Sequence, residues 1–144
     1  GVLLAFLMDF GLLGGIFTFL DTTGMYYSLP LLTIHSFAWH ILLILIGVRA
    51  GLCKEADHSL AGWVKCVCLF LACCLAATMF NLLFYPYGRI NMFYISPYYA
   101  MRQVVFRDIA GLLGNSAGIL LYILSIITGS GLVHLFWNRL TTAR

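Results

Sequence analysis

The chain is short of charge. Only 9% of its 144 residues are charged, while 62% are hydrophobic, and soluble domains average about a quarter charged. A water-soluble domain could not bury that much apolar side chain, so the composition indicates that lipid is the solvent. The net charge of +3 comes from eight scattered basic residues. Because nucleic-acid binding requires a continuous basic face, we exclude nucleic acid as a partner and expect membrane lipids instead.

Familiar catalytic motifs are also missing. The sequence contains no serine elbow, no phosphate-binding Walker loop and no zinc-protease motif. Five cysteines are present, four of them in the apolar run CVCLFLACC at residues 66–74. Their spacing does not fit the Cys-x-x-Cys pattern of a tetrahedral metal site, and an apolar helix favours the neutral thiol. We therefore interpret the cysteines as inert packing residues, and we expect no metal and no cofactor.

Long apolar runs dominate the sequence. Four segments approach the ~20 residues that a helix needs to cross a bilayer. The runs are continuous and do not alternate with polar residues, which favours helices over the strands of a barrel. We predict an all-α membrane protein, a bundle of about four transmembrane helices. The predicted spans are residues 2–20, 29–48, 62–84 and 117–137.

The connections between these spans differ in character. Residues 21–28 are short and polar, which predicts that the first two spans form an antiparallel hairpin. Residues 85–116 are aromatic but hold two prolines and three arginines, a composition typical of a segment that lies in the interface or re-enters the membrane. Since no repeat or linker interrupts the chain, we predict one transmembrane domain over residues 1–144. We expect it to be a piece of a longer membrane protein.

The basic residues predict the orientation. Five of the eight fall between the second and third spans, at the start of the third span, or after the fourth, and three fall in residues 85–116. Cytoplasmic loops carry the excess of lysine and arginine. We therefore expect a multi-pass protein with both termini in the cytoplasm.

Polar side chains inside the spans are the candidate catalytic residues, because placing them in lipid is costly. Asp9 lies in the middle of the first span, His35 lies one to two turns into the second, and His134 lies near the end of the fourth. A carboxylate beside an imidazole orients it as a general base or a proton relay, so we predict that Asp9 meets His35 across the hairpin. Asn81 is a further candidate partner of His35. A hydrogen bond between helices, without chemistry, is an equally good interpretation of each residue.

Two further sets of residues are relevant to binding. His35 and His40 are five residues apart, about 140° around a helix, so we expect only one of them to face a site and the two not to hold a metal. In the third connection Asn91, Tyr94 and Arg102 are candidate substrate-binding residues. Capping of a turn is the alternative interpretation of Asn91.

Three stretches resemble the carboxyl-terminal half of the YwaF-like family of integral membrane proteins. The first stretch, FGLLGGIFTFLDTTG, resembles the family's glycine-rich helix that ends in a polar turn. The second, LLTIHSFAWHILLILIGV, resembles its next helix, which carries a histidine followed by a small residue. The third, FNLLFYPYGRINMFYISP, resembles its asparagine-containing helix end and the motif that follows it. The resemblance covers most of the chain. The matching residues are His35, Ser36, Asn81, Asn91, Phe93, Tyr94 and Pro97. Met92 departs from the family, which usually has tyrosine there.

The resemblance implies a function. Eukaryotic relatives of the family look like lipid acyltransferases that use a cysteine and a histidine in the membrane. It therefore implies that His35 is a catalytic base and that the cysteine belongs to further amino-terminal helices. Those helices, or another membrane subunit, would be the partner of this chain.

Three functions are consistent with these observations. The first is the histidine-bearing half of a membrane-embedded lipid acyltransferase-like enzyme, which predicts that His35 lies near Asp9, Asn81 or Asn91 beside a lipid-sized cavity. The second is a small transporter or substrate-binding subunit in which residues 85–116 form a gate, with a cavity lined by Asn91, Tyr94 and Arg102. The third is a structural or assembly subunit without chemistry of its own, which predicts no cavity.

Overall fold

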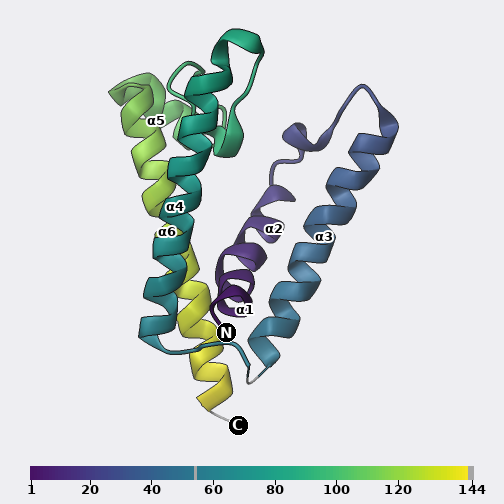
Figure 1. Cartoon of the computed structure of the whole chain (residues 1–144), viewed down its shortest axis with the longest axis vertical. Coiled ribbons are helices and arrows are strands. Elements are labelled where there is room, and N and C mark those ends of the chain that lie inside the picture. The colour runs from purple at the N-terminus through teal and green to yellow at the C-terminus, as the bar shows by residue number, and fades with distance from the viewer. Residues whose placement is uncertain (54, 143–144) are drawn as a thin grey trace. The chain divides into compact units, whose positions relative to one another are not determined.

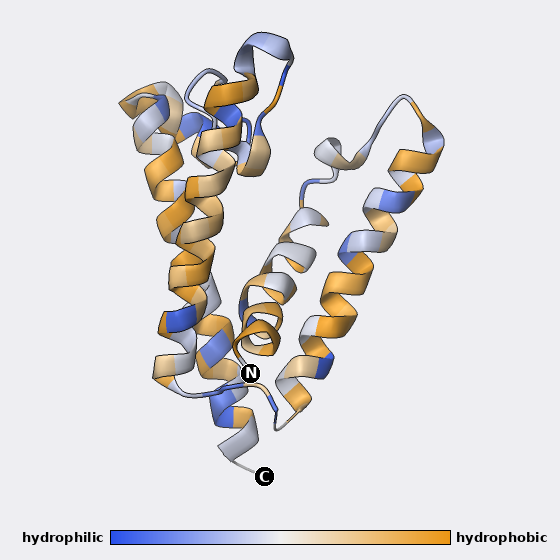
Figure 2. Cartoon of the chain, in the orientation of Figure 1, coloured by the Kyte–Doolittle hydropathy of each residue, from blue (hydrophilic) through white to orange (hydrophobic). Residues whose placement is uncertain are grey.

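A computed structural model describes residues 1–53 and 55–142 of the chain (Figure 1). Over these residues the structure is helical and contains no β-strand, in agreement with the predicted all-α fold. Within the described residues, three helices are long and apolar enough to cross a membrane, and Figure 2 shows apolar residues along most of their length. They are α3 (Pro30–Leu52), α4 (Leu60–Phe84), which the one-turn helix η3 (Tyr85–Tyr87) extends, and α6 (Asn115–Thr142).

The first predicted span takes a different form. It consists of α1 (Val2–Phe6), a π-helical turn η1 (Leu7–Gly11) and α2 (Leu12–Thr18). The combined segment is apolar but shorter than the other three helices. At ~1.5 Å per residue it reaches ~25 Å, less than the ~30 Å of a bilayer's hydrocarbon core. Membrane crossing by this segment, and with it the helix count of four, stays a prediction, as does the orientation of the termini.

The chain divides into two compact units. Unit 1 comprises residues 1–66 and 128–144, and unit 2 comprises residues 67–127. Both boundaries fall inside helices, in α4 and in α6.

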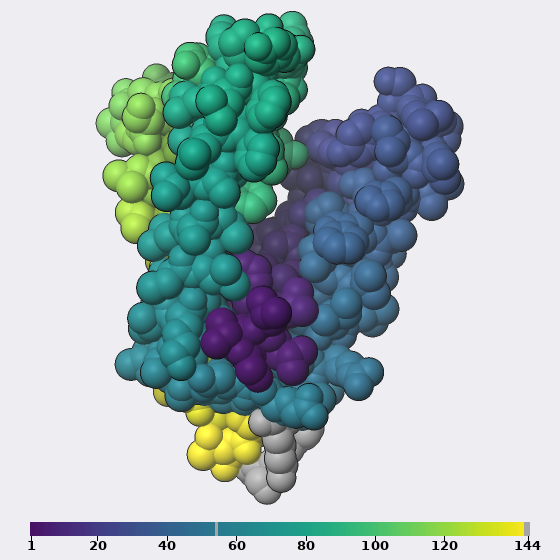
Figure 3. Space-filling model, in the orientation of Figure 1, coloured from purple at the N-terminus to yellow at the C-terminus, as the bar shows by residue number. Residues whose placement is uncertain are grey.

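In unit 1 the α1–η1–α2 segment packs along α3 as an antiparallel hairpin, as predicted (Figure 1). Figure 3 shows the start of the chain in contact with α3. Glycines allow this close approach. A Cβ on Gly15 would meet Ile44, whereas a Cβ on Gly47 would lie 2.7 Å from the Leu12 Cβ and 2.8 Å from the Leu7 carbonyl oxygen. Residues early in the first segment thus lie beside residues late in α3, as in an antiparallel pair. Because lipid gives helices no hydrophobic drive to associate, such close van der Waals contact holds the hairpin together.

The connection before α4 provides the cap of that helix. The backbone N–H of Gly62 donates to the Ser59 hydroxyl oxygen at 3.0 Å, and the Ser59 hydroxyl donates to Asp57 Oδ1 at 2.6 Å. The Ser59 backbone N–H donates to the same oxygen at 3.1 Å. Both bonds from Ser59 lower the pKa of Asp57 below the ordinary value of an aspartate, and the bond from the hydroxyl has the larger effect.

Unit 2 contains the third connection. Between η3 and α6 it forms the one-turn helix η4 (Met92–Tyr94) and the short helix α5 (Phe106–Leu113). The predicted boundary of the last span at residue 117 is close to the observed start of α6 at Asn115. Most of residues 88–105 is irregular backbone, whose polar groups need partners if they lie at membrane depth.

Candidate functional site

A buried hydrogen bond between two side chains joins distant parts of the sequence in unit 1. Asp9 lies in the π-helical turn η1 and is fully buried, and His134 lies on α6 and is 3% exposed. His134 Nδ1 is 2.9 Å from Asp9 Oδ2, and His134 Nε2 is 3.0 Å from the backbone carbonyl oxygen of His58. Single turns of π-helix occur frequently at functional sites.

The predicted pairing of Asp9 with His35 is wrong, because Asp9 bonds to His134 instead. The reason is the register of the hairpin. Gly47 packs against Leu7 and Leu12, which flank Asp9 along the chain. His35 lies twelve residues before Gly47 on α3, about 18 Å along the helix axis at ~1.5 Å per residue.

His35 lies instead in a groove on unit 1. The groove has a volume of about 300 Å³ and is lined by Tyr27, Leu32, His35, Ser36, Trp39 and His40. The His35 side chain is exposed, and the residues that the structure describes offer it no hydrogen-bond partner. Both histidines line the groove. About 140° around the helix separates them, so they stand at the two edges of the face that Leu32, Ser36 and Trp39 form. The expectation that only one of them faces a functional site stays a prediction.

The hydrogen bond of His40 fixes its tautomer. Nδ1 of His40 is 2.7 Å from the backbone carbonyl oxygen of Ser36. A carbonyl only accepts, so Nδ1 carries the hydrogen in the neutral ring and Nε2 presents its lone pair. A neutral imidazole in this state is able to accept a proton from a substrate hydroxyl.

In unit 2 asparagines hold the irregular backbone of the third connection. The buried Asn81 donates from Nδ2 to the Met92 carbonyl oxygen at 3.1 Å and accepts the Met92 N–H at 2.7 Å. Asn115 donates to the Tyr99 carbonyl oxygen at 3.0 Å and accepts the Met101 N–H at 2.8 Å. Each amide side chain thus satisfies one backbone donor and one backbone acceptor, which is what irregular backbone requires in a membrane.

The predicted substrate-binding residues lie along the same connection. Asn91 Oδ1 accepts the backbone N–H of Ser96 at 2.9 Å, a bond of the turn-capping kind that was the alternative interpretation. Tyr94 is partly exposed and has a φ of 60°, in the left-handed region. The Arg102 side chain is exposed. A role for these three residues in binding a substrate stays a prediction.

Sequence reasoning missed several of these contacts. Asn115 was not singled out, although its place after Gly114 and before a long apolar run is typical of a helix cap. His58 lies in a polar connection and contributes through its backbone carbonyl, which no side-chain pattern reveals. His134 was noticed as an ionisable residue in an apolar run, but its partner depends on packing.

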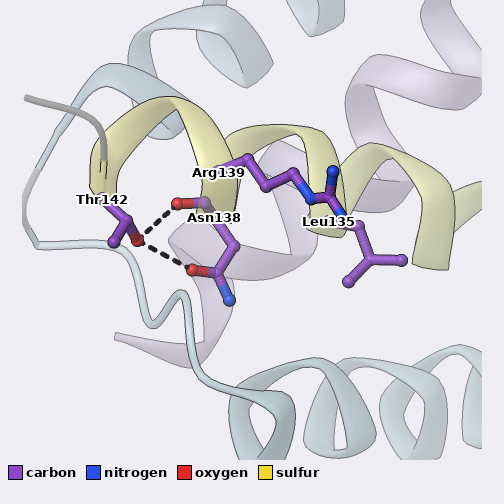
Figure 4. A pocket seen from close by; sticks show the side chains of 4 residues that line it. All are labelled: Leu135, Asn138, Arg139 and Thr142. Carbon is purple, nitrogen blue, oxygen red and sulfur yellow. Dashed lines mark hydrogen bonds between the residues drawn. The ribbon is translucent and has the colours of Figure 1, made fainter.

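The cysteines and a second pocket are further features of the described part of the chain that bear on a metal or binding site. Among the residues described, no three or more His, Cys, Asp or Glu side chains are grouped to hold a metal ion. Cys66 is buried, and its thiol lies 3.6 Å from the Val2 carbonyl oxygen. Figure 4 shows an open pocket of about 410 Å³ on α6. Its lining residues, Leu135, Asn138, Arg139 and Thr142, follow one another on a single helix face, where the Thr142 hydroxyl donates to the Asn138 carbonyl oxygen at 2.7 Å.

No protein-family model matches the chain, and no curated protein or solved structure is significantly similar to it.

Proposed function

We propose that this chain is the histidine-bearing part of a multi-pass membrane enzyme that transfers an acyl group between lipids. The observation that carries the proposal is the groove on unit 1, where His40 donates from Nδ1 to the Ser36 carbonyl oxygen and keeps Nε2 available as a base. The resemblance of the sequence to the YwaF-like family, whose eukaryotic relatives look like lipid acyltransferases, supports the same class of reaction.

The lining of the groove suits an amphipathic substrate. Tyr27, Leu32 and Trp39 provide apolar surface, and Ser36 and the two histidines provide polar groups. His35 and His40 lie five and ten residues after Pro30, about 8 and 15 Å along α3 from its first residue. A 23-residue helix exceeds the ~30 Å hydrocarbon core by only a few ångströms. His35 therefore lies about 6 Å inside the edge of the hydrocarbon core and His40 lies near its middle, so an acyl ester must enter the core to reach both side chains.

The chemistry requires one base and one hydrogen-bond donor. The hydroxyl of an acceptor lipid attacks the carbonyl carbon of an acyl ester, and His40 Nε2 takes the hydroxyl proton as the new C–O bond forms. His35 donates a hydrogen bond to the carbonyl oxygen, on which negative charge develops. When the tetrahedral intermediate collapses, the old C–O bond breaks and His40 returns the proton to the departing alkoxide. Asp9 and Asn81 take no part, because each is committed to another partner.

Lipid analysis of membranes that carry the full-length protein tests this proposal. His40→Gln keeps a polar side chain but removes the base, and we expect it to lower acyl transfer by a factor of about 10²–10⁴. His35→Gln tests the donor. Leu45→Ala is the matched control, since Leu45 is exposed on α3 outside the groove. Lipid profiles of His40→Gln identical to those of the wild type at equal protein levels would refute the proposal.

The two alternatives predict other outcomes. A transporter would lose uptake of its substrate when Asn91 or Arg102 is replaced, with no change in the acyl composition of the lipids. An assembly subunit would tolerate replacement of both groove histidines. These alternatives stay predictions.

A further inference from the structure

We propose that Asp9 and His134 form a proton-binding site inside unit 1, and that its proton fastens α6 to the π-helical turn and to the connection before α4. The inference rests on the geometry of the pair, and it uses no residue of the groove on α3.

The bonding of His134 requires the proton. The carbonyl oxygen of His58 only accepts, so Nε2 of His134 carries a hydrogen. At the other ring nitrogen, a 2.9 Å contact between Nδ1 and Asp9 Oδ2 is a hydrogen bond only if one hydrogen lies between the two atoms. That hydrogen makes either an imidazolium beside a carboxylate or a neutral imidazole beside a carboxylic acid. In both forms the pair is neutral overall and holds one shared proton.

Loss of this proton has a defined structural cost. A singly protonated His134 keeps only one of its two hydrogen bonds. With the hydrogen on Nε2, the lone pair of Nδ1 faces a lone pair of the carboxylate; with the hydrogen on Nδ1, the lone pair of Nε2 faces the His58 carbonyl oxygen. The remaining negative charge would sit on Asp9, which is fully buried. An isolated buried charge is strongly unfavourable, so the site favours either uptake of the proton or separation of the two elements.

Few other groups near the pair titrate. Asp9 interacts electrostatically with His58 in the connection, and Cys66 on α4 interacts with Asp9. His58 donates from Nε2 to the Cys53 carbonyl oxygen at 3.3 Å, and its Nδ1 is buried with no hydrogen-bond partner among the described residues. The buried residues of α3 at this level, Gly47, Ala50 and Gly51, carry no titratable side chain.

The neighbouring contacts explain why the coupling is to α6. One turn before His134, the hydroxyl of Ser130 accepts a hydrogen bond from Trp63 Nε1 at 3.2 Å. One turn after it, the buried Trp137 ring packs against Gly51. These three contacts lie on one face of α6, and the central one depends on a proton.

Two isotope measurements on the full-length protein in lipid nanodiscs test the site. Histidine ¹⁵N spectra report which ring nitrogens carry hydrogen, and aspartate ¹³C spectra report whether Asp9 is ionised. Near neutral pH we expect one shared proton, seen as a doubly protonated His134 beside an ionised Asp9 or as a protonated Asp9 beside a His134 protonated at Nε2. An ionised Asp9 beside a singly protonated His134 would overturn the proposal, and this measurement needs no variant.

Asp9→Asn tests the coupling to α6. Its amide donates to a neutral His134 Nδ1 and keeps the bond at every pH, so it is the matched variant that has no titrating proton. In alkaline buffer we expect backbone amides of residues 130–137 to exchange about tenfold faster in the wild type than in Asp9→Asn at the same pH. Equal exchange in the two proteins over the whole pH range would show that the proton fastens nothing.

Discussion

Replacement of Gly47 by alanine should separate the α1–η1–α2 segment from α3. A Cβ at this position would lie 2.7 Å from the Leu12 Cβ, 2.8 Å from the Leu7 carbonyl oxygen and 3.1 Å from the Leu12 Cα. Carbon atoms pack best at ~3.5–4.0 Å, so the two elements must move apart by about 1 Å. Two of the three obstructing atoms belong to the backbone, and rotation of a side chain cannot relieve them.

The expected cost follows from two opposing terms. Overpacking costs ~1–3 kcal/mol, and the backbone obstruction places Gly47→Ala at the upper end of this range. Alanine favours a helix over glycine by ~1 kcal/mol. The net loss is about 2 kcal/mol, or about a thirtyfold change in the ratio of folded to unfolded protein.

Gly14→Ala is the matched control, because Gly14 lies in α2 of the same hairpin and a Cβ there would meet nothing within 4 Å. It gains the helical preference without a clash, so the two variants should differ by ~3 kcal/mol. Reversible unfolding in mixed micelles of mild detergent and dodecyl sulfate, followed by tryptophan fluorescence, measures the free energies of unfolding. If Gly47→Ala were as stable as Gly14→Ala, the close packing of this hairpin would be refuted.

Other predictions concern the backbone clamps and the cap of α4. Asn81→Leu leaves the N–H and the carbonyl of Met92 without their partner and should lower the free energy of unfolding by ~2–5 kcal/mol. Equal stability of Asn81→Leu and the wild type would contradict the clamp. Ser59→Ala should cost about 1 kcal/mol through the lost cap. Because the pKa of Asp57 is lowered in the folded state, its contribution to stability is present above the ordinary aspartate pKa and is lost as the pH falls through the lowered value. Unfolding midpoints in acid should therefore depend less on pH in Asp57→Asn, and an unchanged pH dependence would count against this bond network.

The sequence alone determined the class of the protein, because composition and the length of apolar runs act locally. The predicted span at residues 29–48 is α3, which continues to Leu52, since Arg49, Ala50 and Leu52 favour a helix beyond the last strongly apolar residue. Asp9 and His134 were recognised as costly residues in apolar runs for the same reason. Each of these inferences needs only the neighbours of a residue along the chain.

Only the tertiary structure decided which polar residues meet. Asp9 and His134 are 125 positions apart in the sequence, and their contact depends on the register in which α3 and α6 pack around the first segment. The glycines that set this register also displaced Asp9 from His35 by about 18 Å along α3. Packing determines which polar residues pair in this protein. The close contacts that fix the depth of each helix are made by residues without charged or hydrogen-bonding side chains, and a pattern of polar residues does not reveal them.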